Sequence, residues 1–310
     1  MDAVGKILEE QLVTHGLSPA YAAIRTLTEV IRRSNESTGQ GLIKELEQAK
    51  ECLINEPHPL KSHTGRTPLS VMSGCDMFLH HIHKTLSEGD RAEFQNIKTK
   101  LVSQGLKLSE MRPICLNRIT QMALRSFKDG QVILVHGYSE VVVTILLKAA
   151  EKFNITVLVT ECRPFCEGYL MCEQLCKAEV SNKLIVDNAV ACVMESVDMV
   201  MIGAEAVVEN GGVVNRIGTY GIGLIAKSFL KPLYVCADSL KFVRMFPLSQ
   251  RDLPEFTQGT VKAWPGHKMW QEIMTPIVDL TPPELITLLF TDLGILTPSG
   301  ISDELIQLFR

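Results

Sequence analysis

Residues Met199–Ser228, MVMIGAEAVVENGGVVNRIGTYGIGLIAKS, pass from an apolar run through a polar, glycine-rich segment to an apolar helical pattern. The run that ends at Ile202 predicts a strand buried on both faces, with Glu205 close to its carboxyl end. A helical pattern resumes at about Tyr220. The stretch therefore predicts a strand, a loop that carries polar groups, and a helix.

The loop of this stretch brings hydrogen-bond acceptors, amide donors, a cation and flexible backbone together within a few residues. These residues are Glu209, Asn210, Gly211, Gly212, Asn215, Arg216, Gly218 and Thr219. Glycines let backbone amides approach a phosphate, and the following helix would point its positive N-terminus toward it. The loop therefore predicts a site for a small polar anion. The alternative is a tight turn at Asn210-Gly211-Gly212, with Asn215 capping the helix.

Short apolar runs alternate with helical stretches from Gln131 onward. The runs are 132–135, 156–159, 183–186, 199–202 and 233–236. This alternation predicts an α/β fold with a Rossmann-like, doubly wound parallel sheet and right-handed crossovers. Such sheets bind ligands in the crevice beyond the carboxyl ends of their strands. The residues expected at that rim are 136–139, 160–163, 187–188, 203–205 and 237–239.

The first part of the chain has helical spacing. Ser18-Pro19 predicts a helix start, and Ile24, Leu27 and Ile31 then repeat on one face. Similar patterns continue to Lys128. The sequence therefore predicts two domains, an N-terminal α-helical domain at 1–128 and a Rossmann-like α/β domain at 129–310.

Composition narrows the class of protein. The chain has 310 residues, of which 46% are hydrophobic and 21% charged, and its net charge of -4 argues against a nucleic-acid binder. No basic n-region followed by an apolar segment opens the sequence, and no uninterrupted apolar span reaches the about 18 residues that a membrane helix needs. Nine cysteines without a secretory signal fit reduced thiols. We expect a cytosolic protein without a membrane segment.

Two groups of side chains could in principle bind a metal ion. The pairs Cys162/Cys166 and Cys172/Cys176 place thiols one helical turn apart, unlike the turns of structural zinc sites. The segment 58–83 holds five histidines, but only Asp76 and His80 form an i,i+4 pair. Two ligands do not make a site. The sequence therefore predicts no metal.

Nucleotide motifs are absent where they would be needed. No GxGxxG follows the first predicted strand, and the chain has no GxxxxGK[ST].

His136 could act as a general base or be structural, because no nucleophile stands beside it in the sequence. Arg163, beside Pro164, is a candidate phosphate ligand. No cofactor is expected.

Several blocks carry a family resemblance that covers nearly the whole chain. They are AAIRTL at Ala22–Leu27, SGCDMFL at Ser73–Leu79, ILVHGYS at Ile133–Ser139, IGAEAVVENGGVVNRIGTYGIGLIAK at Ile202–Lys227, SLKFVRMFPLSQRDLP at Ser239–Pro254 and ITLLFTDLGILTPSGISDELI at Ile286–Ile306. In this order they resemble the regulatory subunits of eukaryotic translation initiation factor 2B, α type. The same superfamily contains methylthioribose-1-phosphate isomerases.

The resemblance implies a regulatory role in translation initiation rather than catalysis. It implies a homodimer that joins β, γ, δ and ε subunits in a decamer, with guanine-nucleotide exchange on initiation factor 2 performed by ε. It also implies that the N-terminal helices help to recognise the phosphorylated α subunit of initiation factor 2. No direct contact with nucleic acid or membrane is implied.

The isomerases supply the alternative function. The resemblance implies that the isomerases have a catalytic cysteine at the position of Gly137 and a catalytic aspartate at the position of Glu205. Gly137 can neither donate a proton nor attack, so isomerase activity is not expected. Around these positions Arg163-Pro164 and Gly168 resemble RPxxQG, with Glu167 in place of glutamine, and 215–220 resemble NKIGTY.

We therefore expect a non-catalytic pocket for a sugar phosphate or similar anion. Its expected residues are His136, Tyr138, Arg163, Glu205, Asn210, Gly211, Asn215, Arg216, Gly218 and Thr219. A general ligand-binding scaffold is the third possibility, because one Rossmann-like sheet hosts both enzymes and inert modules.

Overall fold

The structure is a computed structural model that describes residues 3–55, 68–88, 94–254, 258–262 and 272–309. The chain divides into two compact units. The helical unit comprises residues 1–114 and 306–310, and the sheet unit comprises residues 115–305. The boundary between the predicted domains, 128/129, stays a prediction.

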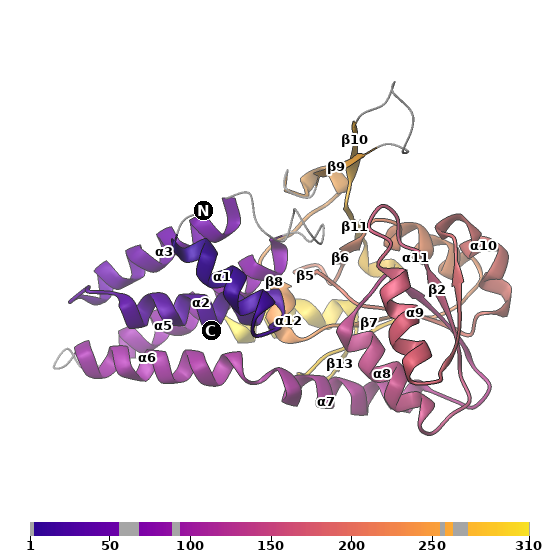
Figure 1. The fold of residues 1–310 in the computed structure, drawn as a ribbon, viewed down its shortest axis with the longest axis horizontal. Helices are drawn as coiled ribbons and strands as arrows, with labels where there is room; N and C mark the ends of the chain where they lie inside the picture. The colour runs from indigo at the N-terminus through magenta and orange to yellow at the C-terminus, as the bar shows by residue number, and fades with distance from the viewer. Residues whose placement is uncertain (1–2, 56–67, 89–93, 255–257, 263–271, 310) are drawn as a thin grey trace. The chain divides into compact units, whose positions relative to one another are not determined.

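Helices make up the described part of the helical unit (Figure 1). They are α1 (Ala3–Val13), α2 (Pro19–Arg33), α3 (Gly39–Asn55), α5 (Leu69–Glu88) and α6 (Phe94–Ser109). Helix α2 lies at the centre, where it packs against α1, α3, α5 and α6. It begins after Ser18, as the sequence predicts, although the Ser18 side chain makes no capping hydrogen bond. Burial on several sides explains why nearly all of its apolar residues are inaccessible to solvent.

The crossing of α2 and α5 depends on a glycine. A Cβ atom on Gly74 would lie 2.4 Å from the carbonyl oxygen of Ala20 and 2.9 Å from its Cα. Both atoms belong to the backbone, so the helices would have to separate. Gly74→Ala is expected to lower the free energy of unfolding by about 2 kcal/mol, because overpacking outweighs the better helix propensity of alanine.

Urea unfolding followed by circular dichroism measures this change. Gly221→Ala is the matched control, because Gly221 is also helical but has no atom within 4 Å of the added Cβ. We expect the control to be neutral or stabilising by up to about 1 kcal/mol. Equal stability of the two variants would show that α2 and α5 tolerate separation.

The main sheet of the sheet unit has seven strands in the order β13-β12-β7-β4-β1-β2-β3 (Figure 1). Its strands are β1 (Val132–His136), β2 (Thr156–Thr160), β3 (Ser181–Ile185), β4 (Met199–Ile202), β7 (Leu233–Cys236), β12 (Leu288–Phe290) and β13 (Ile295–Leu296). All neighbours are parallel except β12 and β13. The fold class and the five predicted strands are confirmed, and β12 adds a sixth parallel strand.

Helices connect the parallel strands in two directions. From β1 the chain passes through α8 (Glu140–Ala150) to β2 and through α9 (Gly168–Lys177) to β3. It then returns through α10 (Val190–Val193) to β4 and continues through α11 (Thr219–Ser228) to β7. Right-handed crossovers place these two pairs on opposite faces of the sheet, and α8 contacts α9 while α10 contacts α11. The order reverses between β1 and β4, which is where such sheets bind ligands.

The core of the sheet unit lies between the sheet and the α8/α9 layer. It is built from apolar residues of β1, β2 and β4 together with α7 (Arg112–Ala123), α8 and α9. Val135, Val159 and Met201 are each no more than 1% exposed. This packing fixes the carboxyl ends of three neighbouring strands against one another, and the candidate site lies there.

The segment predicted as a glycine-rich loop between β4 and α11 is instead a hairpin. Strands β5 (Ala206–Val208) and β6 (Val213–Arg216) pair antiparallel, and β11 (Val278–Thr281) and β8 (Phe242–Val243) flank them in a second, four-stranded sheet. The prediction of a loop that carries polar groups is therefore wrong for this segment, and the alternative, a tight turn at Asn210-Gly211-Gly212, fits the hairpin. Its valines are fully buried, and buried backbone of this kind needs the hydrogen bonds that strand pairing supplies.

Two further segments complete the sheet unit. The region 254–276 contains the antiparallel strands β9 (Gln258–Lys262) and β10 (Glu272–Pro276). Both tryptophans of that region lie outside the described residues. Helix α12 (Ile301–Leu308) begins in the sheet unit, and its residues from Ile306 onward belong to the helical unit. Among the helices that the structure describes, none has the length and apolar character to cross a bilayer.

Candidate functional site

His136 ends β1 and is 4% exposed. Its Nε2 lies 2.9 Å from the carbonyl oxygen of Ile217, so Nε2 carries the proton and donates it. Its Nδ1 then accepts the hydrogen bond of the Thr160 hydroxyl, 2.6 Å away on the paired position of β2. Burial lowers the pKa of His136. The imidazole is thus neutral, with both nitrogens used by the protein, which fits the structural alternative for this residue.

Gly137 leaves space that a neighbouring thiol uses. A Cβ atom on Gly137 would lie 3.0 Å from Sγ of Cys162, which follows β2. The same Sγ lies 3.7 Å from Nε2 of His136. Burial, followed by the charge of Glu167, raises the pKa of Cys162 above its usual range, so the thiol stays protonated. A buried neutral thiol beside a neutral imidazole is not an activated nucleophile.

Arg216 is the buried cation of the site, with a side chain only 5% exposed. Its Nε and Nη2 donate to the two carboxylate oxygens of Glu167 at 2.7 and 2.6 Å, and Nη1 lies 3.1 Å from Oε1 of Glu205. The ring of Phe165 lies 5.3 Å from the guanidinium carbon. Burial lowers the pKa of Arg216, but Glu205 and Glu167 outweigh it and the net pKa is raised. Arg216 is permanently charged, and its charge is compensated by two carboxylates.

Asn210 and Gly211 lie in the β5–β6 turn. The Asn210 Oδ1 accepts a hydrogen bond from the Gly212 amide at 2.9 Å, and its Nδ2 donates to the Pro247 carbonyl. Gly211 has φ of 83°, and a side chain there would collide with the carbonyl of Pro298. The polar groups of this turn therefore serve the turn, as the alternative in the sequence suggested.

Asn215 and Thr219 lie at the other end of the hairpin, where α11 begins. Nδ2 of Asn215 donates to the Thr219 hydroxyl at 3.1 Å, and that hydroxyl donates to the carbonyl of Arg216 at 2.6 Å. Both residues are buried. Since these are hydrogen bonds within the protein, the two side chains hold the start of α11 in place.

Asp279 occupies the N-terminus of α11. Its Oδ2 accepts from the amides of Gly218 at 2.7 Å and Tyr220 at 3.1 Å, and the residue is 6% exposed. Burial raises the pKa of Asp279 to about 7, although the two amide hydrogen bonds lower it. The sequence led us to expect a bound anion at this helix N-terminus. Its amides instead donate to a carboxyl group of the protein itself.

Arg163 differs from the other candidates because its side chain is 66% exposed. It pairs with Glu161 at 3.3 Å, while its backbone amide and that of Cys162 donate to Asp187 at 2.7 and 2.8 Å. Tyr138 is half-buried and packs against the core. Arg163 can therefore turn toward a ligand at the rim, whereas its backbone is fixed.

The structure brings one group of predicted residues together and leaves others apart. The cluster joins His136, Glu205, Asn215, Arg216, Gly218 and Thr219. Asn210 and Gly211 belong to the turn, and Arg163 is solvent-exposed. Cys162 and Asp187 lie at the rim where the sequence places them, although neither was among the expected pocket residues, and sequence reasoning missed Asp279. A carboxylate within the apolar run of 277–280 is the signal that could have found Asp279, since buried charges require partners.

No group of three or more potential metal ligands occurs among the residues that the structure describes. Asp76, one half of the i,i+4 pair noted above, instead pairs with Lys50. His58 and His63 lie outside the described ranges.

Fold and site together define a Rossmann-like α/β protein with an N-terminal helical unit, whose rim contains a buried arginine between two carboxylates. The chain belongs to the initiation factor 2 subunit family, whose sequence pattern matches residues 17–298. The family expected from the resemblance is confirmed.

Relatives and solved structures agree with this assignment. The chain is 43% identical to the translation initiation factor eIF2B subunit alpha of Dictyostelium discoideum, covering 94% of this chain and 92% of the relative. It is 33% identical to the subunit of the same name from Caenorhabditis elegans, covering 94% and 93%.

Two crystal structures share the fold. The translation initiation factor eIF-2B of Pyrococcus horikoshii OT3 has a TM-score of 0.72 at 20% identity, covering 96% of this chain and 98% of that one. A chain of the tetrameric eIF2B-beta2-delta2 complex of C. thermophilum has a TM-score of 0.77 at 19% identity, covering 98% and 94%.

Proposed function

We propose that this chain is a regulatory subunit, α type, of the guanine-nucleotide exchange factor for translation initiation factor 2. The observation that carries the proposal is the 43% identity, over nearly the full length of both chains, to a protein named eIF2B subunit alpha. The 33% identity to a second protein of that name supports it. The subunit works in the cytosol, in translational control under stress.

The chain acts through assembly. Two copies pair, and with β, γ, δ and ε subunits they form a decamer in which ε performs nucleotide exchange. The C. thermophilum complex is a tetramer of other subunits of this factor, which supports association between chains of this kind. The N-terminal helices contribute to recognition of the phosphorylated α subunit of initiation factor 2.

The chemistry of the rim argues against catalysis. Gly137 has no side chain at the position of the isomerase cysteine, and the nearby Cys162 is a neutral thiol. Glu205, at the position of the isomerase aspartate, pairs with Arg216. An ion-paired carboxylate without a proton donor opposite it is poorly suited to proton transfer between two carbons. The isomerase alternative is therefore disfavoured.

The same rim supplies a pocket for a sugar phosphate. Arg163 can turn toward the ligand, and Tyr138 lies beyond the end of β1. The charge of Arg216 is compensated by Glu167 and Glu205. Arg163 would therefore be the main cation that binds the phosphate. If Arg163→Ala leaves unchanged any thermal shift produced by millimolar sugar phosphates, this pocket assignment is wrong.

Glu167→Gln is expected to strengthen binding of a sugar phosphate about 10-fold, because it removes one of the two negative charges that neutralise Arg216. The measurement is titration calorimetry with a panel of sugar phosphates. Glu173→Gln is the control, since Glu173 is exposed on α9 and pairs only with Lys177 among the contacts described. An unchanged affinity in Glu167→Gln would show that Arg216 does not contribute to ligand binding.

Native mass spectrometry of the tagged chain, purified gently from its own cells, tests the regulatory role. We expect a large assembly that contains four other subunits in paired stoichiometry. A homodimer reproducibly free of those partners would overturn the role.

A further inference from the structure

Asp187 follows β3 and joins it to the backbone that follows β2. Its Oδ1 accepts a hydrogen bond from the amide of Cys162 at 2.8 Å, and its Oδ2 accepts one from the amide of Arg163 at 2.7 Å. A carboxylate offers an acceptor oxygen to each of two successive amides, whereas an asparagine offers one acceptor and places a donor beside it. Asp187 therefore ties the loop that begins at Cys162 to the end of the neighbouring strand.

The loop that Asp187 holds has an unusual backbone. Cys162 has φ of 59°, in the left-handed region that residues other than glycine adopt when their surroundings enforce it. The amide of Cys166 donates to the carbonyl of Cys162 at 2.8 Å and so closes the loop. At the far end, a Cβ atom on Gly168 would lie 2.0 Å from the carbonyl oxygen of Thr160, because the backbone there lies directly against the end of β2. The loop is thus fixed at both ends, and Asp187 fixes its beginning.

This loop carries three side chains of the rim. Glu167 accepts two hydrogen bonds from Arg216, and the ring of Phe165 lies 5.3 Å from the same guanidinium group. These contacts hold Glu167 and Phe165 in place. The side chain of Arg163 is instead largely exposed. Its direction depends on the position of its own backbone, which the hydrogen bond to Asp187 sets.

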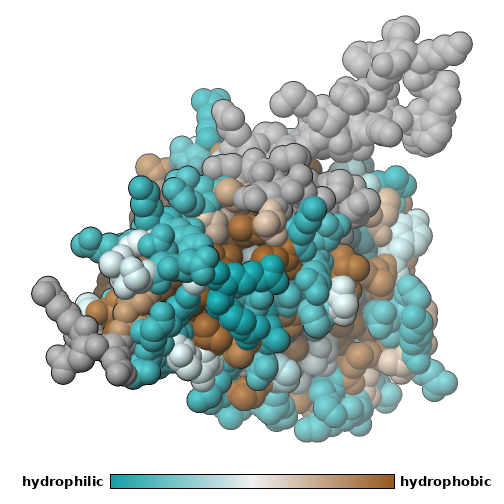
Figure 2. Space-filling model, turned by 60° about the vertical axis from the view of Figure 1, so that its left-hand side comes forward, coloured by the Kyte–Doolittle hydropathy of each residue, from teal (hydrophilic) through white to brown (hydrophobic). Residues whose placement is uncertain are grey.

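Exposure alone does not make an arginine a ligand-binding group. Figure 2 shows strongly hydrophilic side chains among apolar ones across the face that it draws, so exposed polar groups are common on this chain. A long side chain loses conformational freedom when it binds a phosphate. A backbone that is already fixed lowers that cost, because only the side chain then has to be ordered. Arg163 has such a backbone.

We propose that Asp187 is a positioning residue of the sugar-phosphate pocket, which directs Arg163 toward the ligand by holding the first two amides of the loop. The inference rests on the pocket proposed above. Removing the charge of Asp187 would relieve a repulsion on the phosphate that water and salt screen at the rim. Removing one of its acceptor oxygens breaks a charge-assisted hydrogen bond to the backbone. We therefore expect the loss of positioning to outweigh the relief of repulsion.

Titration calorimetry of the full chain with glucose 6-phosphate and ribose 5-phosphate tests this role. We expect Asp187→Asn to weaken binding about 5-fold, because one backbone amide then faces a donor. Asp198→Asn is the matched control, since Asp198 also accepts a backbone hydrogen bond, from Val132 at 2.7 Å, but at the amino ends of the strands. Both variants should lower Tm by about 2–4 °C, and only Asp187→Asn should lower the affinity.

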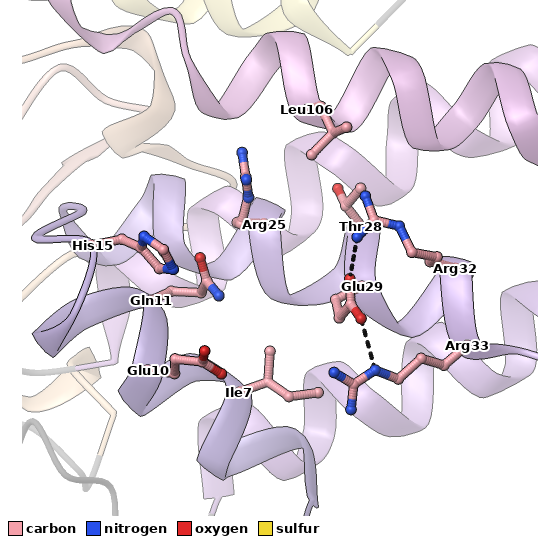
Figure 3. Close-up of a pocket in the computed structure, with 10 residues that line it drawn as sticks. All are labelled: Ile7, Glu10, Gln11, His15, Arg25, Thr28, Glu29, Arg32, Arg33 and Leu106. Carbon is pink, nitrogen blue, oxygen red and sulfur yellow. Dashed lines mark hydrogen bonds and ion pairs between the residues drawn. The ribbon is translucent and has the colours of Figure 1, made fainter.

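A double-mutant cycle separates positioning from a general loss of structure. If Asp187 acts through Arg163, the effect of Asp187→Asn on affinity should disappear in the Arg163→Ala background. Arg33→Ala is a further control, because the guanidinium of Arg33 pairs with Glu29 in the helical unit (Figure 3). It should leave the affinity for both probes unchanged.

The outcomes distinguish this role from the pocket itself. If the wild-type chain binds a probe and Asp187→Asn binds it equally well, the pocket stands and the positioning role is wrong. The role is also wrong if the effect persists in Arg163→Ala, because Asp187 would then act independently of Arg163. Affinity that is lost in Arg33→Ala would place the ligand in the helical unit and overturn both. If neither probe binds the wild-type chain at millimolar concentration, the pocket fails and the role fails with it.

Discussion

Arg216→Met is expected to lower the free energy of unfolding by about 3–5 kcal/mol at pH 8, a larger loss than that expected from Gly74→Ala. Glu167 and Glu205 are 14% and 13% exposed, and Arg216 is the cation between them. Without it, two carboxylates would face each other in a poorly hydrated space. The repulsion between these two uncompensated carboxylates accounts for the size of the expected loss.

Thermal unfolding measures this effect, with an expected decrease in Tm of about 10 °C. The matched control is the triple variant Arg216→Met/Glu167→Gln/Glu205→Gln, which removes the cation and both anions. Replacing a whole buried ion pair is often neutral, so the triple variant should recover most of the lost stability. If it is as unstable as Arg216→Met alone, the contact of the guanidinium group with the Phe165 ring matters more than the pairing with the two carboxylates.

Asp279→Asn is expected to change how stability depends on pH. The pKa of Asp279 in the folded chain is about 7, against a usual value of 3.8. The folded state therefore holds a proton that the unfolded state has released between about pH 4 and 7, and wild-type stability falls as the pH rises through this window. The stability of Asp279→Asn relative to wild type should then rise by about 3 kcal/mol from pH 5 to pH 8.

Denaturant unfolding of both proteins across this pH range makes the comparison. His136 titrates with the opposite sign, because burial lowers its pKa and stability rises as it loses its proton. Taking the difference between two chains that share His136 removes its contribution. A difference that stays flat with pH would mean that Asp279 is ionised in the folded chain, held so by the amides of Gly218 and Tyr220.

The candidate site shows how far sequence reasoning can reach. The apolar runs predict the parallel strands and so place His136 and Glu205 at one rim, as the structure has them. The stretch between β4 and α11 resembles a loop in the sequence because its two strands are only three and four residues long and each holds just two valines. An Asn-Gly pair between such runs is in fact a strong hairpin signal. Polar residues that looked free to bind an anion were therefore those that build the turn.

By itself, the sequence determined the class of fold, the helical first part, the strands of the main sheet and the family. These features follow from local periodicity and from blocks of residues that are read along the chain. The tertiary structure alone decided which polar groups still have hydrogen-bonding capacity. Glu167 meets Arg216 across 49 residues, and Asp279 meets the start of α11 across about 60. Such pairs depend on how distant segments fold together. The interaction between two charges is set by their separation in space and not by their separation along the chain.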